Sequence, residues 1–235
     1  MDSSFLLKIA KDVLGTDVIA VTAVSPLQPG YEKRFAEGIA HRLAVKHITI
    51  NPEPLNRKEV RYNTKNRCYY CKLVLMQKLK QIARQYGYVV IEATSKSDLL
   101  DHRPGIKALQ RLGIASPLVE AGFEKREIRK AAHRSKLPNW NTPSAACLAS
   151  RIPYGQEITK KRLLRIEKAE NYLRRFRFTQ IRVRDHYPIA RIEINNREFK
   201  IMLREHRKIA RYFKDLGYRF VTLDLAGYRT GSFDL

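Results

Sequence analysis

Hydrophobic residues near the start of the chain follow first a helical and then a strand-like pattern. Apolar side chains recur at helical spacing over residues 5–14, and Gly15 ends this segment. Three residues that can each cap a helix N-terminus precede it: Asp2, Ser3 and Ser4. Residues 18–24 are almost continuously apolar, which predicts a strand covered on both faces, as in a parallel sheet.

The same alternation continues through the first part of the chain. Further helices are predicted over residues 31–44, 68–86 and 124–136, and further strands over residues 47–50 and 88–91. Helices that alternate with short apolar strands predict a doubly wound α/β sheet.

The pattern changes over residues 138–155, where Pro, Asn, Ser and Gly interrupt the apolar periodicity. We place a domain boundary there, between domains 1–142 and 143–235. The elements predicted beyond it are a helix over 159–177, strands over 180–185 and 189–194 that turn at Tyr187 and Pro188, a helix over 197–216 and a strand over 220–225. This order predicts a small α+β domain.

The composition is that of a globular protein. The 235 residues are 44% hydrophobic, enough for one large domain or two modest ones. No apolar run approaches the ~20 residues that span a bilayer, and no signal-peptide pattern opens the chain. We therefore expect a cytoplasmic protein without a membrane partner, in which thiols stay reduced.

The charge balance is strongly basic. Lys and Arg number 46 against 23 Asp and Glu, so the net charge is +23. Such a charge favours anionic partners: nucleic acid, nucleotides, or a small substrate rich in phosphate and carboxylate. A solvated basic surface without a specific partner is the alternative that charge alone leaves open.

Three cysteines are the most informative polar feature. Cys68 and Cys71 form a C-x-x-C pair, and Cys147 lies far from them in the sequence. An odd number of thiols suits a three-thiolate metal site better than a disulfide framework. Three thiolates on an iron–sulfur cluster would leave one iron without a protein ligand. From spacing alone, two incidental helix cysteines and one core cysteine remain an equal alternative.

Several short stretches carry a family resemblance. Asp2 and Ser3 resemble the end of the Ser-Gly-Gly-x-Asp-Ser loop of the PP-loop ATPases. The whole chain resembles the LarE family of that superfamily, ATP-dependent sulfur transferases that help mature the nickel-pincer nucleotide cofactor. The matching stretches follow in order along the chain: Arg67–Lys72, Asp101–Gly105, Asn139–Asn141, Ala146–Gly155, Arg182–Arg184, Ile189–Glu193 and Leu223–Arg229.

The resemblance implies a fold, an activity and partners. It implies a Rossmann-like PP-loop ATP pyrophosphatase domain followed by a small C-terminal α+β substrate-binding domain. ATP with Mg²⁺ would adenylate a carboxylate of a pyridinium dicarboxylate mononucleotide, and sulfur would then replace AMP. A sulfide donor and a homo-oligomer belong to the same expectation.

The resemblance also separates two sources of sulfur. One subgroup sacrifices the sulfur of a single cysteine, at the position where this chain has Ala146. Here Cys147 follows one residue later, and the Cys68/Cys71 pair is added. This pattern resembles the subgroup whose three cysteines hold a [4Fe–4S] cluster, although Cys147 could itself be a donor.

Individual site residues follow from the matching positions. On the ATP side the resemblance implies Asp2, Ser3, Ser4, Ser25 and Asp98. A loop cap is the plain alternative for Ser25. The family often shows Asp-Gly where this chain has Glu92 and Ala93, just before the Asp98 loop.

On the substrate side, Arg182 and Arg184 alternate along one strand and therefore share a face, and the resemblance implies that they bind the substrate phosphate. It also implies that Glu170 is a carboxylate of the substrate-binding site. We expect Cys147 and Arg151 to be catalytic residues. The alternatives are a surface-exposed basic strand, a solvated helix-face charge at Glu170 and an interdomain salt bridge at Arg151. Three aromatic residues are expected to pack: Tyr69, Tyr70 and Trp140.

The phosphate loop is short in this chain, since only four residues precede Phe5. We expect the native protein to begin at least ~10–20 residues upstream, with a strand that lies centrally in the sheet, where strands are about 4.8 Å apart. Without that segment, ATP turnover and stability should be impaired. Two rival functions are a tRNA thiolase, favoured by the charge, and an inactive relative that binds nucleotides or RNA.

Overall fold

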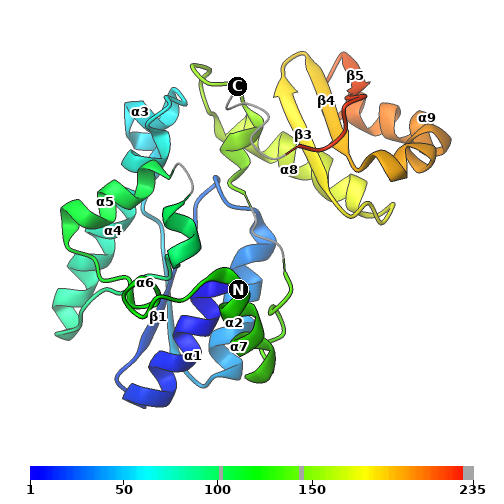
Figure 1. Cartoon of the computed structure of the whole chain (residues 1–235). Coiled ribbons are helices and arrows are strands. Elements are labelled where there is room, and N and C mark those ends of the chain that lie inside the picture. Colours follow the sequence, from blue (N-terminus) through cyan, green and yellow to red (C-terminus); the bar gives the residue numbers. More distant parts are fainter. Residues whose placement is uncertain (101–102, 143–145, 230–235) are drawn as a thin grey trace. The chain divides into compact units, whose positions relative to one another are not determined.

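The computed structural model describes residues 1–100, 103–142 and 146–229. It divides into two compact units (Figure 1). Unit 1 comprises Met1–Val60 and Lys65–Ala145, and unit 2 comprises Arg61–Thr64 and Ala146–Leu235. The boundary predicted between residues 142 and 143 stays a prediction, because residues 143–145 lie outside the described part.

Unit 1 is a mixed α/β structure. Its elements are α1 (Asp2–Leu14), β1 (Ile19–Ala23), α2 (Gly30–Arg42), β2 (Lys46–Ile50), η1 (Pro54–Asn56), α3 (Lys58–Arg61, which ends in unit 2), α4 (Arg67–Tyr86), η2 (Lys96–Leu99), α5 (Pro104–Leu112), α6 (Pro117–Glu120) and α7 (Lys125–Arg134). Every helix predicted for this part of the chain is present, with ends shifted by one or two residues.

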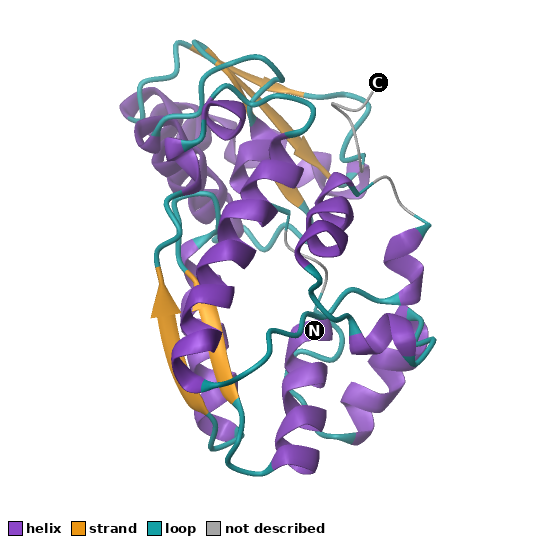
Figure 2. Cartoon of the chain, turned by 90° about the vertical axis from the view of Figure 1, so that its left-hand side faces the viewer, coloured by secondary structure: helices purple, strands orange, loops and turns teal. Residues whose placement is uncertain are grey.

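The sheet of unit 1 consists of β1 and β2, which run parallel side by side (Figure 2). Their register pairs Ile19 with Lys46 and Ala23 with Ile50. Helix α2 connects the two strands and packs against both. The predicted strands over residues 18–24 and 47–50 are therefore confirmed.

The predicted strand over residues 88–91 is wrong. In this segment only Ile91 makes a bridge, to Ala115, so the apolar run has no neighbour with which to form a ladder. The expected burial of the first strand on both faces is also wrong, because all five residues of β1 are partly exposed. Cavities of about 220 and 140 Å³ adjoin β1, and Ile91 borders both.

Helices supply most of the core of unit 1. Phe5 and Leu6 of α1 pack with Ile128 and Ala132 of α7 in one cluster. A second, smaller cluster joins α4 to α5 and contains Met76, Leu109 and Ile114.

Unit 2 contains the second sheet. Its elements are η3 (Leu148–Arg151), α8 (Lys160–Arg174), β3 (Ile181–His186), β4 (Ile189–Ile194), η4 (Asn196–Glu198), α9 (Phe199–Asp215) and β5 (Phe220–Leu223). The strand order is β3-β4-β5, with β3 antiparallel and β5 parallel to β4. The α+β arrangement predicted for this region is confirmed, including the β3–β4 turn at Tyr187 and Pro188.

The two faces of this sheet differ in chemistry. Val183 pairs with Ile192 in the ladder, and both join the buried cluster formed with residues of α8 and α9. Arg182 pairs with Glu193 on the opposite face, because neighbouring strand residues point to opposite sides. Helices therefore cover the apolar face, and the charged face carries the arginines singled out in the sequence.

A short segment from far upstream completes unit 2. The side chain of Asn63 donates hydrogen bonds to the carbonyls of Ile152 and Pro153, at 2.7 and 2.8 Å. In return, the backbone N–H of Gly155 donates to the Asn63 carbonyl, and that of Ile158 donates to the Arg61 carbonyl. Asn63 is fully buried and has a positive φ of 50°.

The described ranges contain no helix that is long and apolar enough to cross a membrane.

Candidate functional site: a buried arginine cluster in unit 2

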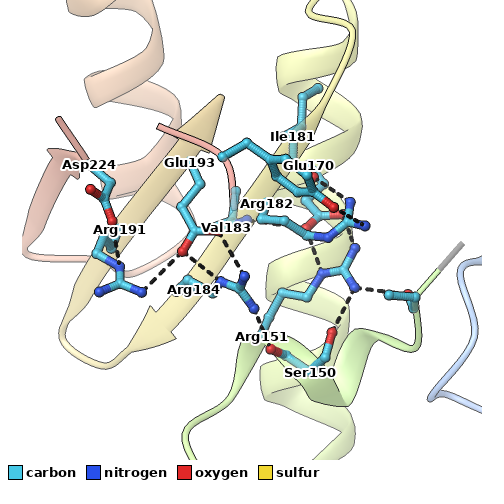
Figure 3. A network of polar contacts seen from close by, with 12 residues as sticks. Ser150, Arg151, Glu170, Ile181, Arg182, Val183, Arg184, Arg191, Glu193 and Asp224 are labelled. Atoms are coloured by element: carbon cyan, nitrogen blue, oxygen red, sulfur yellow. Dashed lines mark hydrogen bonds and ion pairs between the residues drawn. The ribbon is translucent and has the colours of Figure 1, made fainter. Parts of the chain in front are cut away.

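Three arginines of unit 2 gather on and beside the charged face of its sheet (Figure 3). Arg151 ends η3, and Arg182 and Arg184 come from β3. We call these residues the arginine cluster. Two carboxylates accompany them: Glu170 from α8 and Glu193 from β4.

Arg151 and Glu170 form a bidentate ion pair. The Nε and Nη2 atoms of Arg151 donate to the two carboxylate oxygens of Glu170 at 2.8 and 3.0 Å. Arg151 is 2% exposed and Glu170 is fully buried. The backbone N–H of Val183 also donates to Glu170, at 3.1 Å, which links α8 to the edge of β3. The alternative of a solvated charge at Glu170 is therefore wrong, and so is that of an interdomain salt bridge at Arg151, because this pair lies within unit 2.

The remaining donors of Arg151 hold the cysteine loop. Its Nη1 atom donates to the carbonyl of Cys147 at 3.0 Å and to the hydroxyl of Ser150 at 3.0 Å. Ser150 in turn donates to the Cys147 carbonyl at 2.8 Å. The structure thus brings the Cys147 loop, Arg151 and Glu170 together, and their roles in catalysis and substrate binding stay predictions.

Arg184 is likewise held by an ion pair and a backbone carbonyl. It makes a bidentate pair with Glu193, at 2.9 and 2.8 Å, and donates to the Ser150 carbonyl at 2.6 Å. Arg191 reaches the same Glu193 carboxylate at 3.0 Å and lies 3.6 Å from Asp224. The alternative of an exposed basic strand is wrong for Arg184, which is 5% exposed.

Arg182 differs from its two neighbours. It donates to the Ile181 carbonyl at 2.8 Å and to the Tyr228 hydroxyl at 3.4 Å, and its guanidinium lies over the Tyr228 ring. Within the described residues, no carboxylate lies within ion-pair distance of it. Burial lowers the pKa of Arg182, and the charge of Arg151 lowers it further. A half-buried cation repelled by nearby arginines is suited to binding an anion.

Three contributors to this site were missed from the sequence: Ser150, Glu193 and Tyr228. All three stand in matching stretches, and Ser150 is next to the chosen Arg151, but no spacing signals a bond across the sheet. Tyr228 follows the last strand, and only the fold brings it to Arg182.

The other two cysteines belong to unit 1. Cys68 and Cys71 lie three residues apart at the start of α4, and Cys68 is exposed. The Nη2 atom of Arg67 lies 3.8 Å from the Cys68 sulfur. All three cysteines are free of disulfides, which suits metal-bound thiolates. The described residues contain no group of three or more potential metal ligands. Since Cys147 lies in unit 2, the three-cysteine set stays a prediction.

The predicted ATP-side residues all lie in unit 1. Ser4 accepts a hydrogen bond from Asn139 at 2.9 Å, and burial raises the pKa of Asp2. Ser3 borders the 220 Å³ cavity together with Ser4. Ser25 accepts a hydrogen bond from the backbone N–H of Leu27 at 3.3 Å, as a loop cap does, and its role toward ATP stays a prediction.

Asp98 is a charged anchor. Its Oδ2 atom accepts two hydrogen bonds from Ser95, and its Oδ1 atom contacts Lys125 at 2.5 Å and Arg103 at 2.8 Å. Burial alone would raise the pKa of Asp98, but the Lys125 and Ser95 hydrogen bonds and the Arg103 charge outweigh burial and lower it. Asp101 of the neighbouring matching stretch lies outside the described residues.

The aromatic residues expected to pack behave differently from one another. Tyr69 and Tyr70 meet edge to face, and Tyr69 accepts a hydrogen bond from Arg111. Trp140 is 38% exposed and contacts His133 at a ring distance of 4.5 Å, so it is not a core residue.

Fold and site together define a mixed α/β protein with a buried cluster of arginines in unit 2. No model of a known protein family matches the chain. An uncharacterized protein of Synechocystis is 38% identical over 234 residues, which cover 98% of this chain and 87% of that protein. The pyridinium-3,5-bisthiocarboxylic acid mononucleotide synthase of Lactiplantibacillus plantarum is 37% identical over 233 residues, 98% of this chain and 84% of that enzyme.

A third relative, an uncharacterized protein of Methanocaldococcus jannaschii, is 33% identical over 187 residues, 79% of this chain and 73% of that protein. Identity at this level over nearly the whole length shows the family. The chain belongs to the LarE family of enzymes.

Proposed function

We propose that the chain is an ATP-dependent sulfur transferase acting on a pyridinium dicarboxylate mononucleotide, in the biosynthesis of the nickel-pincer nucleotide. The proposal includes a PP-loop ATP site with Mg²⁺ in unit 1, a cytoplasmic location, a sulfide donor and a homo-oligomer. ATP would activate the substrate carboxylate as an acyl-adenylate with release of pyrophosphate. Sulfide would then attack the acyl carbon, and AMP would leave.

The observation that carries this proposal is the imbalance in the arginine cluster. Arg151 and Arg184 are each neutralised by a buried carboxylate, whereas the described part of the chain provides no carboxylate within ion-pair distance of Arg182. A dianionic phosphate would supply the missing negative charge, and a guanidinium binds phosphate through two parallel hydrogen bonds. Because the paired arginines are already fixed, little ordering would be needed when the substrate arrives.

Unit 1 supports the nucleotide half of the proposal. Asp98 is held as a carboxylate by two cations and a serine, which suits a fixed acceptor on the adenine side. Asp2, Ser3 and Ser4 lie at the N-terminus of α1, where backbone N–H groups favour phosphate. Ser25 follows β1, at the carboxyl end of the parallel pair, where such sheets bind ligands.

The chemistry of the three thiols fits a [4Fe–4S] cluster, which would supply sulfide when bound. Cys68 and Cys71 are on the first two turns of α4, and the Nη2 atom of Arg67 lies 3.8 Å from the Cys68 sulfur. Cys147 would be the third ligand, and its loop is fixed by Arg151.

Calorimetric binding tests the arginine cluster. The wild type should bind the mononucleotide more tightly than the same nucleoside without phosphate. Arg182→Gln should weaken mononucleotide binding about tenfold or more, since a hydrogen-bonded charge contributes roughly 1.5–3 kcal/mol, and should leave nucleoside binding unchanged. Arg219→Gln, an exposed arginine of the same unit, is the matched control. Equal losses for both ligands, or no loss, would contradict the phosphate role.

Anaerobic reconstitution tests the cluster separately. Iron and sulfide should be bound by the wild type and lost in each of Cys68→Ala, Cys71→Ala and Cys147→Ala. Tyr69→Phe, between the paired cysteines, should retain both elements. If every cysteine variant retained its full iron and sulfide, the three-cysteine [4Fe–4S] site would be contradicted. The phosphate role of the arginine cluster would be unaffected, because it is tested separately.

A further inference from the structure

The exposed side of α9 carries a continuous row of positive charge. Lys200, Arg204, Arg207, Arg211 and Lys214 follow one another at intervals of four, three, four and three residues, and all five are exposed. This spacing places them on one face of the helix. We call them the α9 stripe. From Lys200 to Lys214 the stripe extends about 21 Å at 1.5 Å per residue.

Most of this charge is not neutralised. Glu205 pairs with Arg204 and with the adjacent Lys208, at 3.2 and 3.0 Å. For the other four members of the stripe, the described residues provide no carboxylate within ion-pair distance. A row of like charges at helical spacing destabilises the helix, so a structural role does not explain it.

The stripe is also separate from the arginine cluster. Met202, Ile209 and Phe213 of α9 pack into the core against the apolar face of the sheet. Arg182 projects from the opposite face. The small anionic substrate therefore does not account for the charge of α9, which lies on the far side of the sheet.

The chemistry of the stripe favours one kind of partner. The apolar residues of α9 are used in the core, which leaves Leu203 as the one large apolar side chain exposed along it, so the helix has little to insert into a membrane. No aromatic residue stands in the stripe, so it offers no platform for stacking the bases of a single strand. A second copy of the stripe would repel the first.

A double-stranded nucleic acid meets these conditions. Its phosphates form a regular row of charge, about one per 3.4 Å of axis on each strand, and contacts to them need neither sequence nor base stacking. We propose that the α9 stripe binds the phosphate backbone of a nucleic acid duplex, independently of the small-molecule site.

Fluorescence anisotropy with a labelled 20-base-pair RNA duplex, and with a DNA duplex of the same sequence, at about 50–200 mM salt tests the proposal. The wild type should bind both, with a steep salt dependence. The triple variant Arg207→Gln, Arg211→Gln and Lys214→Gln should lose about tenfold or more in affinity near 100 mM salt. The slope of log K against log salt should fall in magnitude by about 2.7, since each phosphate contact contributes about 0.9.

A matched control removes the same charge elsewhere. Arg126→Gln, Lys130→Gln and Arg134→Gln on α7 of unit 1 also change three exposed basic residues of one helix. Its affinity and salt slope should stay near those of the wild type. Circular dichroism should be the same for all three proteins, because glutamine keeps helix propensity.

Three results would overturn the proposal. Equal losses in the two triple variants would mean that the net charge, not the stripe, binds the duplex. Tighter binding of single-stranded RNA than of the duplex would contradict binding to the phosphate backbone of a duplex. Stripe-dependent binding to vesicles containing anionic lipid, without duplex binding, would assign the surface to a membrane instead.

Discussion

Both units contain a parallel pair of strands joined by a helix, yet the two pairs are buried to different extents. In unit 1, every residue of β1 is partly exposed. In unit 2, four of the six residues of β4 are buried, because β3 pairs with its second edge and two helices cover one face. The comparison teaches that the crossover alone does not bury a strand of a parallel pair. The central strand β4 has a neighbour on each edge and is buried, whereas the edge strand β5 has no buried residue.

The polar groups of the units follow the same division. Unit 2 holds buried charges in two bidentate pairs, Arg151 with Glu170 and Arg184 with Glu193. Unit 1 holds an exposed thiol at Cys68 and a partly exposed one at Cys71. The third cysteine, Cys147, lies in unit 2 and is partly exposed like Cys71.

The largest expected effect comes from the buried ion pair. Glu170→Ala leaves the Arg151 charge buried without its partner, which should lower the free energy of unfolding of unit 2 by about 3–5 kcal/mol. Asp12→Ala breaks the exposed pair with Lys8 in unit 1 and should cost less than about 1 kcal/mol. Hydrogen exchange in increasing urea reads each unit separately. Similar losses of unfolding free energy in the two variants would contradict the difference between the units.

The next largest effect compares β4 with β1, using the same Ile→Ala substitution in each strand. Ile192→Ala in β4 removes a side chain that is 1% exposed and should cost about 2–5 kcal/mol. Ile19→Ala in β1 should cost clearly less, because Ile19 is partly exposed and β1 adjoins cavities. Chemical denaturation of both variants measures the difference. A larger loss for Ile19→Ala would show that β1 is the better packed strand.

Helix caps should not distinguish the units. Thr159 caps α8 by accepting a hydrogen bond from the N–H of Arg162 at 3.2 Å, and Glu127 accepts one from the N–H of Glu124 in the capping box of α7. Thr159→Ala and Glu127→Ala should each cost about 1 kcal/mol. The same denaturation series compares them. A marked inequality would place part of the difference at helix ends rather than in the sheets.

The smallest effect is a dependence on pH. Burial lowers the pKa of His186 in unit 2, and the charge of Arg191 adds to the shift. The unfolded chain therefore takes up this proton first, so unit 2 should lose stability as the pH falls below 6.5. The lowered pKa of Asp98 costs unit 1 stability only below 3.8. Hydrogen exchange of unit 2 at pH 7 and pH 5 should show this loss, and His186→Gln should abolish it.

Local signals in the sequence predicted most helices and strands, but not the contacts between distant residues. Gly87 follows α4 in a left-handed conformation, as its place after an apolar periodic run indicates. Residues 88–91 have the composition of a strand, yet a ladder needs a partner that no local pattern reveals. Glu170 falls on a polar position of a basic helix, and its burial depends on Arg151, nineteen residues away.

The segment Arg61–Thr64 affects when unit 2 can complete its folding during synthesis. Asn63 emerges from the ribosome about ninety residues before the carbonyls of Ile152 and Pro153 that it binds. These hydrogen bonds can therefore form only after all of unit 1 has been made, because residues 65–145 separate the two sequence segments of unit 2. A fragment beginning at residue 146 would lack the hydrogen bonds from Asn63, so truncating the chain at this apparent boundary should yield an incomplete domain.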